Sequence, residues 1–463
     1  MTMGRWLDVL LVAAIGSTLL APIVRRVTAR RFDPFEPYVL FVLAYGVMFV
    51  VRPAAMLATD SRVHVGPLRT LDVSGTFTEM LVVAWLGAIA FIVAYSLPLG
   101  RGLVRPHRPR EESVDTRRLL ILAGVLSGVA VAAFVVLVAS VDGFRTLDAI
   151  FRLGRSRDVE EAAQTYRYLW MSYVFLIPAA LVFLAVGLRT RSRALIAVFF
   201  SLAVLVLLRG IPLGQRMFLL PFLGGVFVLI YVYRSTRPSF RTVVLVVAVA
   251  LLASTFLSDL RGRETRHESV AETVVRSTSP SRLADSVLTG PDTEMAATFA
   301  LALSVVPEQL PYTYGTTIFR DLVVRPIPRS LWSGKPQVPR NELKAVLWPQ
   351  EYANGTINPE FSVLLYFYWD FGLLGVIVGM AAYGIGARYL YEYFVRHGDQ
   401  TYAQVLYSLA LWFVVIGLRD SPVDTIMRAA FVVAPVWLLF RLARSHARAR
   451  RSESASAKLR TVA

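Results

Sequence analysis

Long apolar runs constrain this chain more than any other feature of its sequence. A helix needs about 20 consecutive apolar residues to cross the hydrocarbon of a bilayer. Such runs recur along most of the 463-residue chain, of which 56% is hydrophobic. A soluble protein of this length can bury a large core without so many uninterrupted apolar stretches. The sequence therefore predicts an all-α, polytopic integral membrane protein.

About eleven transmembrane helices are predicted, and arginine marks one side of them. The spans are expected at about residues 6–23, 38–54, 78–98, 119–140, 167–188, 195–212, 217–233, 242–258, 362–393, 403–418 and 426–442. Arginine gathers in alternate connections and in the tail, at residues 25–31, 101–118, 189–193, 234–241 and after 441. Because cytoplasmic loops carry an excess of Lys and Arg, one orientation satisfies all five groups. It places the N-terminus outside and the C-terminus in the cytosol.

These spans divide the chain into four parts. Residues 1–258 carry the first eight spans, 259–361 form a long outer loop, 362–442 carry the last three spans, and 443–463 are a basic cytoplasmic tail. The tail is expected to be solvated or to lie on anionic lipid. A loop as long as the outer one is normally functional. Its apolar stretch 294–306 is too short to cross a bilayer and is expected to form a short interfacial or re-entrant helix.

The composition excludes several classes of function. The formal net charge of +17 would suggest nucleic-acid binding in a soluble protein, but here topology explains the inner arginines, so no nucleic-acid partner is expected. With no cysteine, the chain forms no disulfide, thiolate nucleophile or zinc–thiolate site. It contains no HExxH, paired-histidine or DxD pattern and no GxxxxGK(S/T) loop. We therefore expect no metal, no other cofactor and no nucleotide-driven pump.

The long outer loop is rich in cations, although the topology rule asks for the fewest arginines on that side. Prolines fix φ and remove backbone donors in its segment "RPIPRSLWSGKPQVPRN" (325–341), which predicts a rigid, extended shape rather than a helix. Arginine forks match phosphate oxygens, and aromatic faces stack on sugars or cover lipid tails. The candidate cations are Arg320, Arg325, Arg329 and Lys335, and the candidate aromatic contacts are Tyr312, Tyr314 and Trp332.

Interfacial aromatic and arginine side chains also form ordinary belts and anchors. Taken singly, the three aromatic residues fit such a belt, whereas the cation group as a whole favours a ligand site. Arg209 and Arg216 bracket a second outer turn, "RGIPLGQR". Two interpretations of this pair stay open: the arginines anchor the ends of two spans, or they grip a pyrophosphate.

The order of these features resembles the Wzy-type O-antigen and exopolysaccharide repeat-unit polymerases, which are related to the O-antigen ligases. The resemblance covers about residues 200–385. It rests on "RGIPLGQR", on "YGTTIFRDLVVRPIPRSLWSGKP" in a large late outer loop, and on the closing "NGTINPEFSVLLYFYWDFGLLG". The first five spans match in hydropathy alone.

The resemblance implies an enzyme of a bacterial inner membrane. It would transfer a growing glycan from undecaprenyl pyrophosphate to the next lipid-linked repeat unit on the outer face. No metal would be needed, because cationic side chains stabilise the leaving pyrophosphate. These side chains would be Arg209, Arg216, Arg320, Arg325, Arg329 and Lys335.

Glu360 or Asp370 would deprotonate the acceptor hydroxyl, with His267 as a weaker candidate that also fits an ordinary surface residue. The implied partners are lipid-linked oligosaccharides, membrane lipid and, by analogy with the family alone, a regulator of chain length.

Three other functions stay open. A polyprenyl-phosphate-sugar glycosyltransferase is expected to carry an acidic pair in its first outer loop, where this chain has only the isolated Asp60 and Asp72. A flippase for the same lipid-linked sugars is expected to line its centre with charges from many spans, and these spans are nearly charge-free in their middles. A structural scaffold would have no clear use for the Arg-Pro-Trp segment. A one-sided glycan polymerase accounts best for the sequence.

Overall fold

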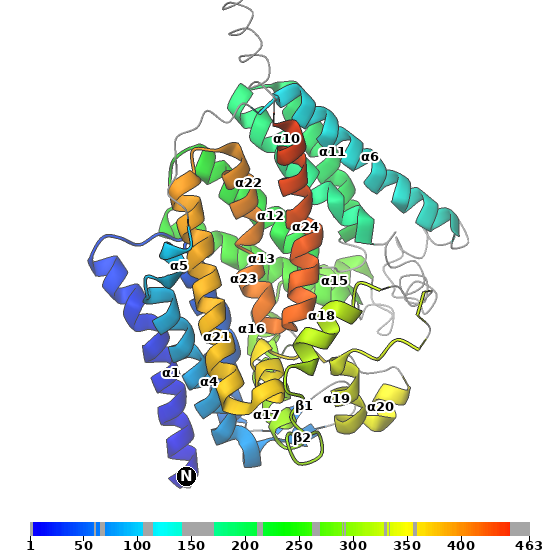
Figure 1. The fold of residues 1–463 in the computed structure, drawn as a ribbon. Helices are drawn as coiled ribbons and strands as arrows, with labels where there is room; N and C mark the ends of the chain where they lie inside the picture. The colour runs from blue at the N-terminus through cyan, green and yellow to red at the C-terminus, as the bar shows by residue number, and fades with distance from the viewer. Residues whose placement is uncertain are drawn as a thin grey trace, which may run out of the picture. The chain divides into compact units, whose positions relative to one another are not determined.

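The computed structural model describes a helical protein (Figure 1). The described residues are 3–59, 62–64, 70–104, 114–140, 171–210, 216–261, 269–288, 290, 293–327, 331–332, 334–354 and 359–444. Within them, the all-α prediction is confirmed, apart from one antiparallel ribbon of β1 (Arg62–His64) and β2 (Thr70–Asp72).

Nine helical segments of the described chain are long and apolar enough to span a membrane. They are Met3–Thr28, Pro37–Ala58, Ser74–Ser96, Thr116–Val136, Tyr173–Thr190, Arg241–Leu260, Val363–His397, Thr401–Arg419 and Pro422–Ala443. Two shorter apolar helical segments, Arg193–Leu208 and Pro221–Tyr233, overlap the predicted sixth and seventh spans. The helices are therefore compatible with a multi-pass membrane protein.

The chain divides into two compact units. Unit 1 comprises Met1–Arg105, Arg237–Glu392 and Leu411–Arg428, and unit 2 comprises Pro106–Thr236, Tyr393–Ala410 and Ala429–Ala463. Two helices, α21 (Val363–His397) and α24 (Pro422–Ala443), contribute residues to both units.

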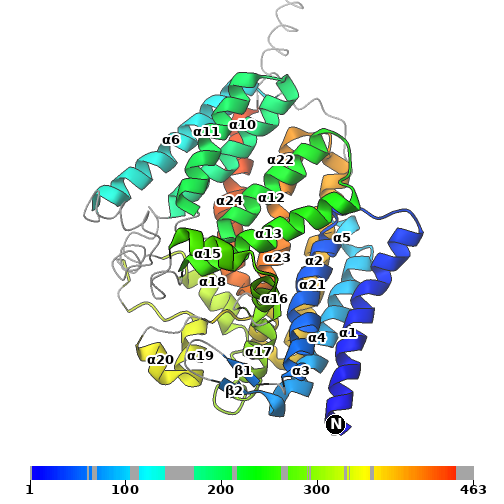
Figure 2. The ribbon, with the colours of Figure 1, turned by 180° about the vertical axis from the view of Figure 1, so that it is seen from behind.

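Unit 1 contains the ribbon, most of α21 and the beginning of α24. Its other helices are α1 (Met3–Thr28), α2 (Pro37–Gly46), the π-helix η1 (Val47–Val51), α3 (Arg52–Ala58), α4 (Ser74–Ser96), α5 (Leu99–Gly102), α13 (Phe240–Arg261), α15 (Val270–Ser277), α16 (Pro280–Leu288), α17 (Met295–Leu303), the π-helix η4 (Thr316–Arg320), α18 (Asp321–Val324), α19 (Pro339–Leu347), α20 (Pro349–Ala353), α23 (Phe413–Ile416) and the 3₁₀-helix η5 (Gly417–Arg419). Helix α4 packs against both α1 and α17; α1 and α4 run side by side in Figures 1 and 2.

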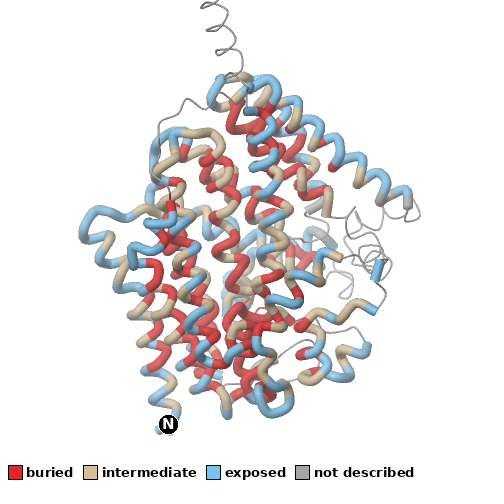
Figure 3. The backbone as a smooth tube through the Cα atoms, viewed as in Figure 1, coloured by how far each residue is buried: buried red, intermediate tan, exposed pale blue. Residues whose placement is uncertain are grey.

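The core of unit 1 forms where α4 meets its neighbours. The Tyr45 hydroxyl of α2 donates to the Ala84 carbonyl of α4 at 2.6 Å, so a buried polar group is satisfied within the bundle. All nine residues of α17 are buried (Figure 3). The stretch predicted as a short interfacial or re-entrant helix does form a short helix, and its apolar side chains pack in the core of unit 1.

A kink interrupts α21 at Phe371 and Gly372, whose φ/ψ angles are not helical. Gly372 has φ of +60°, a conformation that glycine adopts without the cost of a side chain. A Cβ at this position would also lie 3.3 Å from the Tyr312 hydroxyl, so the kink and the Tyr312 side chain pack closely. The kink separates the first turns of α21, which follow the long loop, from the rest of the helix.

Arginines of the predicted inner loops are paired in unit 1. Glu36 lies 3.2 Å from Arg26 and 3.5 Å from Arg388, and it also accepts a hydrogen bond from the Tyr95 hydroxyl at 2.8 Å. Arg237 lies 2.9 Å from Asp33. Arg26 and Arg237 therefore tie helix ends together, a structural role in addition to the topological role that the sequence predicted for their loops, whereas Arg388 lies within α21.

Unit 2 contains the C-terminal turns of α21, most of α24 and six further elements. They are α6 (Thr116–Ser140), the 3₁₀-helix η2 (Tyr173–Phe175), α10 (Leu176–Thr190), α11 (Arg193–Gly210), α12 (Arg216–Tyr233) and α22 (Thr401–Ala410). Helix α10 lies at the centre, because it packs against α6, α11, α12 and α22. Its residues from Leu176 to Gly187 are all buried.

The close approach of α4 and α21 yields a test of the fold. A Cβ at Gly384 would lie 2.4 Å from the Phe91 carbonyl oxygen of α4. Gly384→Ala is therefore expected to force the helices apart and to lower the free energy of unfolding by about 1–3 kcal/mol. Gly386→Ala is the matched control on α21, because a Cβ there meets nothing within 4 Å. Thermal unfolding in detergent should separate the two variants, and equal midpoints would contradict this packing.

Candidate functional site: an arginine cluster in unit 1

Four arginines of unit 1 form the arginine cluster: Arg325, Arg340, Arg419 and Arg428. Arg428 lies within electrostatic range of the other three and of Glu360. They come from three parts of the sequence: the long loop before α21, the connection before α24, and the first turns of α24. The site is therefore assembled by the fold and not by one contiguous motif.

Local sequence signals place α19 and α24 beside this cluster. Pro339 occupies the first turn of α19, where its missing N–H has no helical partner to lose. The Ser421 hydroxyl accepts from the Asp424 N–H at 2.9 Å and lies 3.0 Å from Asp424 Oδ2. This pairing of Ser with an acidic residue three positions later starts α24 in the manner of a capping box. It fixes Asp424 at the helix N-terminus, close to the loop.

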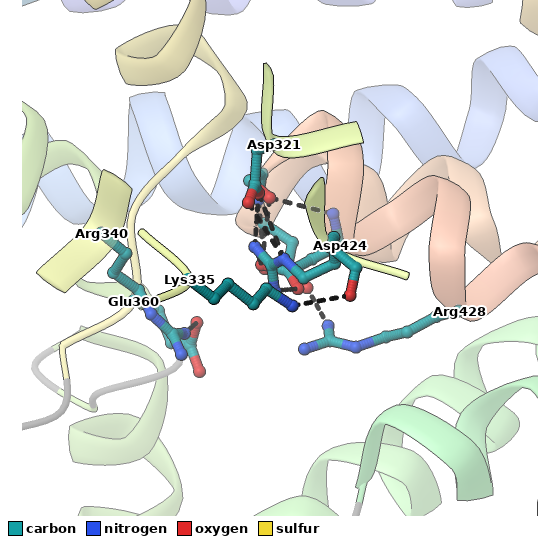
Figure 4. Close-up of polar contacts among 9 residues, drawn as sticks. Asp321, Lys335, Arg340, Glu360, Asp424 and Arg428 are labelled. Carbon is teal, nitrogen blue, oxygen red and sulfur yellow. Dashed lines mark hydrogen bonds and ion pairs between the residues drawn. The ribbon is translucent and has the colours of Figure 1, made fainter. Parts of the chain in front are cut away.

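Arg325 is held by two carboxylates. Its guanidinium lies 2.6 Å from Asp321, four residues earlier, and 2.6 Å from Asp424 on α24. Its side chain is only 9% exposed. Burial on its own would lower the pKa of Arg325, but Asp424 and Asp321 outweigh burial and raise the pKa above its ordinary value. Arg325 therefore joins the long loop to α24, through the Asp321 and Asp424 side chains labelled in Figure 4.

Two further cations are committed to partners in the same region. Arg428 forms an ion pair with the buried Asp420. The Lys335 ammonium donates to the carbonyl oxygens of Arg325 at 3.0 Å and Ile327 at 2.8 Å. Lys335 thereby closes the proline-rich segment on itself. Described residues 325–327, 331, 332 and 334–338 lie outside helices, as the prolines predicted. The prediction is wrong for residues 339–341, which form the first turn of α19, because a proline is tolerated there.

Among Arg325, Arg340 and Arg428, Arg340 lies farthest from its carboxylate partner. Its closest carboxylate is Glu360 at 3.7 Å, and the two side chains are 26% and 24% exposed; they point toward one another in Figure 4. The Nε of Arg340 is buried without a hydrogen-bond partner among the described residues. The exposed part of the Arg340 guanidinium, beside the partly exposed Glu360 carboxylate, can bind an anionic ligand.

Lys344 adds a titratable cation to the site. It follows Arg340 by one turn on α19 and is buried. Burial, reinforced by Arg340, lowers the pKa of Lys344 to about 8, although Glu360 opposes the shift. Lys344 therefore carries its charge through most of the neutral range and loses it in alkaline solution.

Asp370, the second carboxylate predicted as a base, lies in a different environment. It is fully buried at the end of the first segment of α21. It accepts hydrogen bonds from the Thr313 hydroxyl and from the Thr317 N–H at 3.1 Å. These contacts tie α21 to the turn that begins η4. They favour a structural role for Asp370 and leave Glu360 as the better placed of the two carboxylates.

The remaining predicted contact residues of the loop are spread over its surface. Tyr312 packs edge-on against Tyr368, with ring centroids 6.1 Å apart. Tyr314 is 76% exposed and Trp332 is 40% exposed, so neither is needed for the core. Arg320 is exposed and lies 3.7 Å from Glu342. The structure therefore brings Arg325, Lys335 and Glu360 together but leaves Tyr314 and Arg320 exposed at the surface.

The other predicted site residues cannot be placed beside the cluster. His267 and Arg329 lie outside the described residues. Arg209 lies near the end of α11 and Arg216 begins α12. Both belong to unit 2, and their side chains are not among those described. Their joint grip on a pyrophosphate stays a prediction.

Seven residues of this site were not predicted from the sequence: Asp321, Arg340, Lys344, Arg419, Asp420, Asp424 and Arg428. The signal for four of them was the charged sequence "RDSPVDTIMR" (419–428) around the start of the last span. Charge near a membrane segment indicates a functional or structural site. In the described residues, no three His, Asp or Glu side chains converge in a way that would hold a metal ion.

Comparisons with models of protein families, with curated proteins and with solved structures gave no match to the chain. The functional argument therefore rests on the sequence and on the site itself.

Arg325 yields a test of how the site is held together. Arg325→Ala is expected to lower the free energy of unfolding by about 3 kcal/mol, because it leaves Asp321 and Asp424 buried without their cation. Arg320→Ala removes an exposed cation of the same loop and is expected to cost less than about 1 kcal/mol. Denaturant or thermal unfolding in detergent measures both variants. If Arg325→Ala were as stable as Arg320→Ala, the two ion pairs would not hold the loop.

Proposed function

We propose that this protein is a membrane glycosyltransferase that polymerises lipid-linked glycan repeat units. It transfers a growing oligosaccharide from undecaprenyl pyrophosphate to the next lipid-linked unit on the outer face of a bacterial inner membrane. The observation that carries the proposal is the arginine cluster around Glu360, which provides cations and a partly exposed carboxylate in one place. The resemblance of the sequence to the Wzy-type polymerases supports the same function.

In the proposed reaction, the Glu360 carboxylate and the arginines have different roles. The acceptor hydroxyl oxygen forms a bond to the anomeric carbon of the donor sugar, and Glu360 takes the hydroxyl proton. The bond between that carbon and the pyrophosphate oxygen breaks, and the electron pair leaves with undecaprenyl pyrophosphate. Arg340, supported by Arg419 and Arg428, offsets the charge that develops on the leaving group. Guanidinium groups do this without a metal ion.

The proposed site does not give all predicted cations the same role. Arg325 and Lys335 hold the loop in shape, since their donors are engaged by Asp321, Asp424 and main-chain carbonyls. Arg320 and Arg329, with Arg209 and Arg216, stay candidates for further pyrophosphate contacts. Tyr314 and Trp332 are exposed and are candidates for contacts with sugar or lipid.

The proposed topology has eleven spans, with the N-terminus outside and the C-terminus in the cytosol. Nine candidate spans and two shorter apolar helices in the described chain support this number. In this orientation the long loop and the connection before α24 both lie outside. In this topology, residues that are far apart in the sequence, such as Arg325 and Asp424, therefore pair at one face of the membrane.

The alternative is a flippase that moves the same lipid-linked sugars across the bilayer. A flippase would also need cations that recognise pyrophosphate. It would need them at several depths along a path, whereas the described cluster lies among the loop, η5 and the first turns of α24. A one-sided site therefore supports transfer more than passage.

Reconstitution with a lipid-linked oligosaccharide tests the function directly. Wild-type protein is expected to produce a ladder of longer glycans whose yield does not change with EDTA. Arg340→Gln is expected to lower the rate by about 100-fold or more, because it removes a donor aimed at the developing charge. The control for loss of one positive charge is Arg241→Gln, because Arg241 is an exposed residue of α13. If the wild type formed no ladder but moved the lipid-linked glycan across the bilayer, the flippase alternative would replace this proposal.

A further inference from the structure

Helix α17 grips the main chain of Glu360 at two points. Glu294, the N-cap residue of α17, accepts a hydrogen bond from the Glu360 backbone N–H at 3.3 Å through Oε1. Thr298 donates from its hydroxyl to the Glu360 carbonyl oxygen at 2.9 Å. Residues four positions apart lie on one face of a helix. One face of α17 therefore satisfies both backbone polar groups of a single residue.

These two hydrogen bonds connect Glu360 to the buried core of unit 1. Glu360 lies in the irregular segment just before α21, where no regular helix or sheet partner is available. Thr298 is fully buried and Glu294 is 7% exposed. Helix α17 packs on α4 in the core. The position of Glu360 is therefore set by a core helix, although its side chain is partly open to solvent.

We propose that Glu294 and Thr298 are positioning residues that hold Glu360 beside Arg340. The proposal rests on the role given to Glu360 in the proposed function. Glu294 contacts Glu360 but is not placed to touch the reacting atoms, so its effect passes through Glu360 and the arginine cluster.

The charges around Glu294 explain why its proton matters. Glu360 faces it from the segment before α21, Arg52 from α3 and Arg419 from η5. Arg340 and Lys344 of α19 in turn face Glu360. Burial, with Glu360, raises the pKa of Glu294 to about 7, although the Glu360 N–H, Arg52 and Arg419 oppose the shift. Glu294 therefore exchanges this proton near neutral pH.

Ionisation of Glu294 has two consequences for the site. It places a carboxylate beside that of Glu360, which repels it, and it competes for Arg419, which lowers the positive potential offered to an anionic substrate. Transfer is therefore expected to decline as the pH rises through about 7. Folding stability follows the same direction, because the folded state keeps a proton that the unfolded state releases above about pH 4.5. The stability from this proton is present below pH 4.5 and is lost as the pH rises through 7.

Two pairs of variants test whether the hydrogen bonds to Glu360, rather than the bulk of the Glu294 and Thr298 side chains, set the position of Glu360. Glu294→Gln keeps an oxygen that accepts from the Glu360 N–H and cannot ionise, whereas Glu294→Ala removes the acceptor. Thr298→Ser keeps the hydroxyl donor, whereas Thr298→Val removes it and keeps the volume. The threonine pair keeps the proposal testable if Glu294→Ala does not fold.

The experiment measures kcat and KM for the lipid-linked donor between pH 6 and 9. Glu294→Ala and Thr298→Val are expected to lower kcat by about 10-fold or more and to change KM by less than about 3-fold, because a displaced base affects the chemical step most. Glu294→Gln and Thr298→Ser are expected to keep kcat within about 3-fold of wild type at pH 6. The decline of the wild type near pH 7 should be absent in Glu294→Gln.

Hydrogen exchange at the Glu360 amide provides a readout that does not depend on activity. Exchange is expected to be faster in Glu294→Ala than in Glu294→Gln or wild type at the same pH. Equal exchange in all three proteins, or a kcat of Thr298→Val equal to that of Thr298→Ser, would overturn the positioning proposal. If the wild type made no polymer, the proposed function would fail, and the exchange measurement would still decide whether Glu294 grips Glu360.

Discussion

Carboxylates that lie beside arginines in the protein interior fix the geometry of unit 1. A guanidinium in a low-dielectric environment is stable only when its charge is compensated and its donors are satisfied. Asp321 and Asp424 meet this need for Arg325, and Asp420 meets it for Arg428. Glu36 does the same for Arg26 and Arg388. The charged side chains of this apolar chain therefore connect helices through ion pairs and do not serve only as surface groups.

The same constraint determines which cations are available to a ligand. Arg325, Arg428 and Lys335 have close acceptors that hold their side chains in place. Arg340 has one carboxylate at 3.7 Å and a buried Nε without an acceptor in the described part of the chain. The neighbouring arginines, whose donors already have acceptors, add positive potential around Arg340 without a change in their own positions. A phosphate group arriving at Arg340 would meet a pre-arranged site, which is the condition for electrostatic catalysis.

The sequence predicted the helices well because their signal is local. Each apolar run carries its own length and composition, and the nine candidate spans overlap predicted ones. The prolines of the loop likewise predicted a segment outside regular helix. The contents of the site were harder to predict, since the two partners of Arg325 lie 4 and 99 residues away. Composition identified Arg325 as a cation, and only the fold shows that its donors are already engaged.

The carboxylates illustrate the same difference. Glu360 and Asp370 look equivalent in the sequence, as two acidic residues at the start of one span. In the structure, Asp370 is fully buried with Thr313 and Thr317, whereas Glu360 is partly exposed beside Arg340. Glu294, 66 residues from Glu360, carried no signal at all, because a lone acidic residue before an apolar stretch is common at helix starts.

Binding of a lipid pyrophosphate to the purified protein would show whether the arginine cluster recognises this group. Native mass spectrometry of the purified protein would count bound undecaprenyl pyrophosphate as its concentration and the salt concentration are varied. We expect saturable binding that weakens with salt, is tighter than binding of the corresponding monophosphate, and is lost in Arg340→Gln but kept in Arg241→Gln. Equal binding of the pyrophosphate by wild type and Arg340→Gln would contradict the assignment of the arginine cluster as its site.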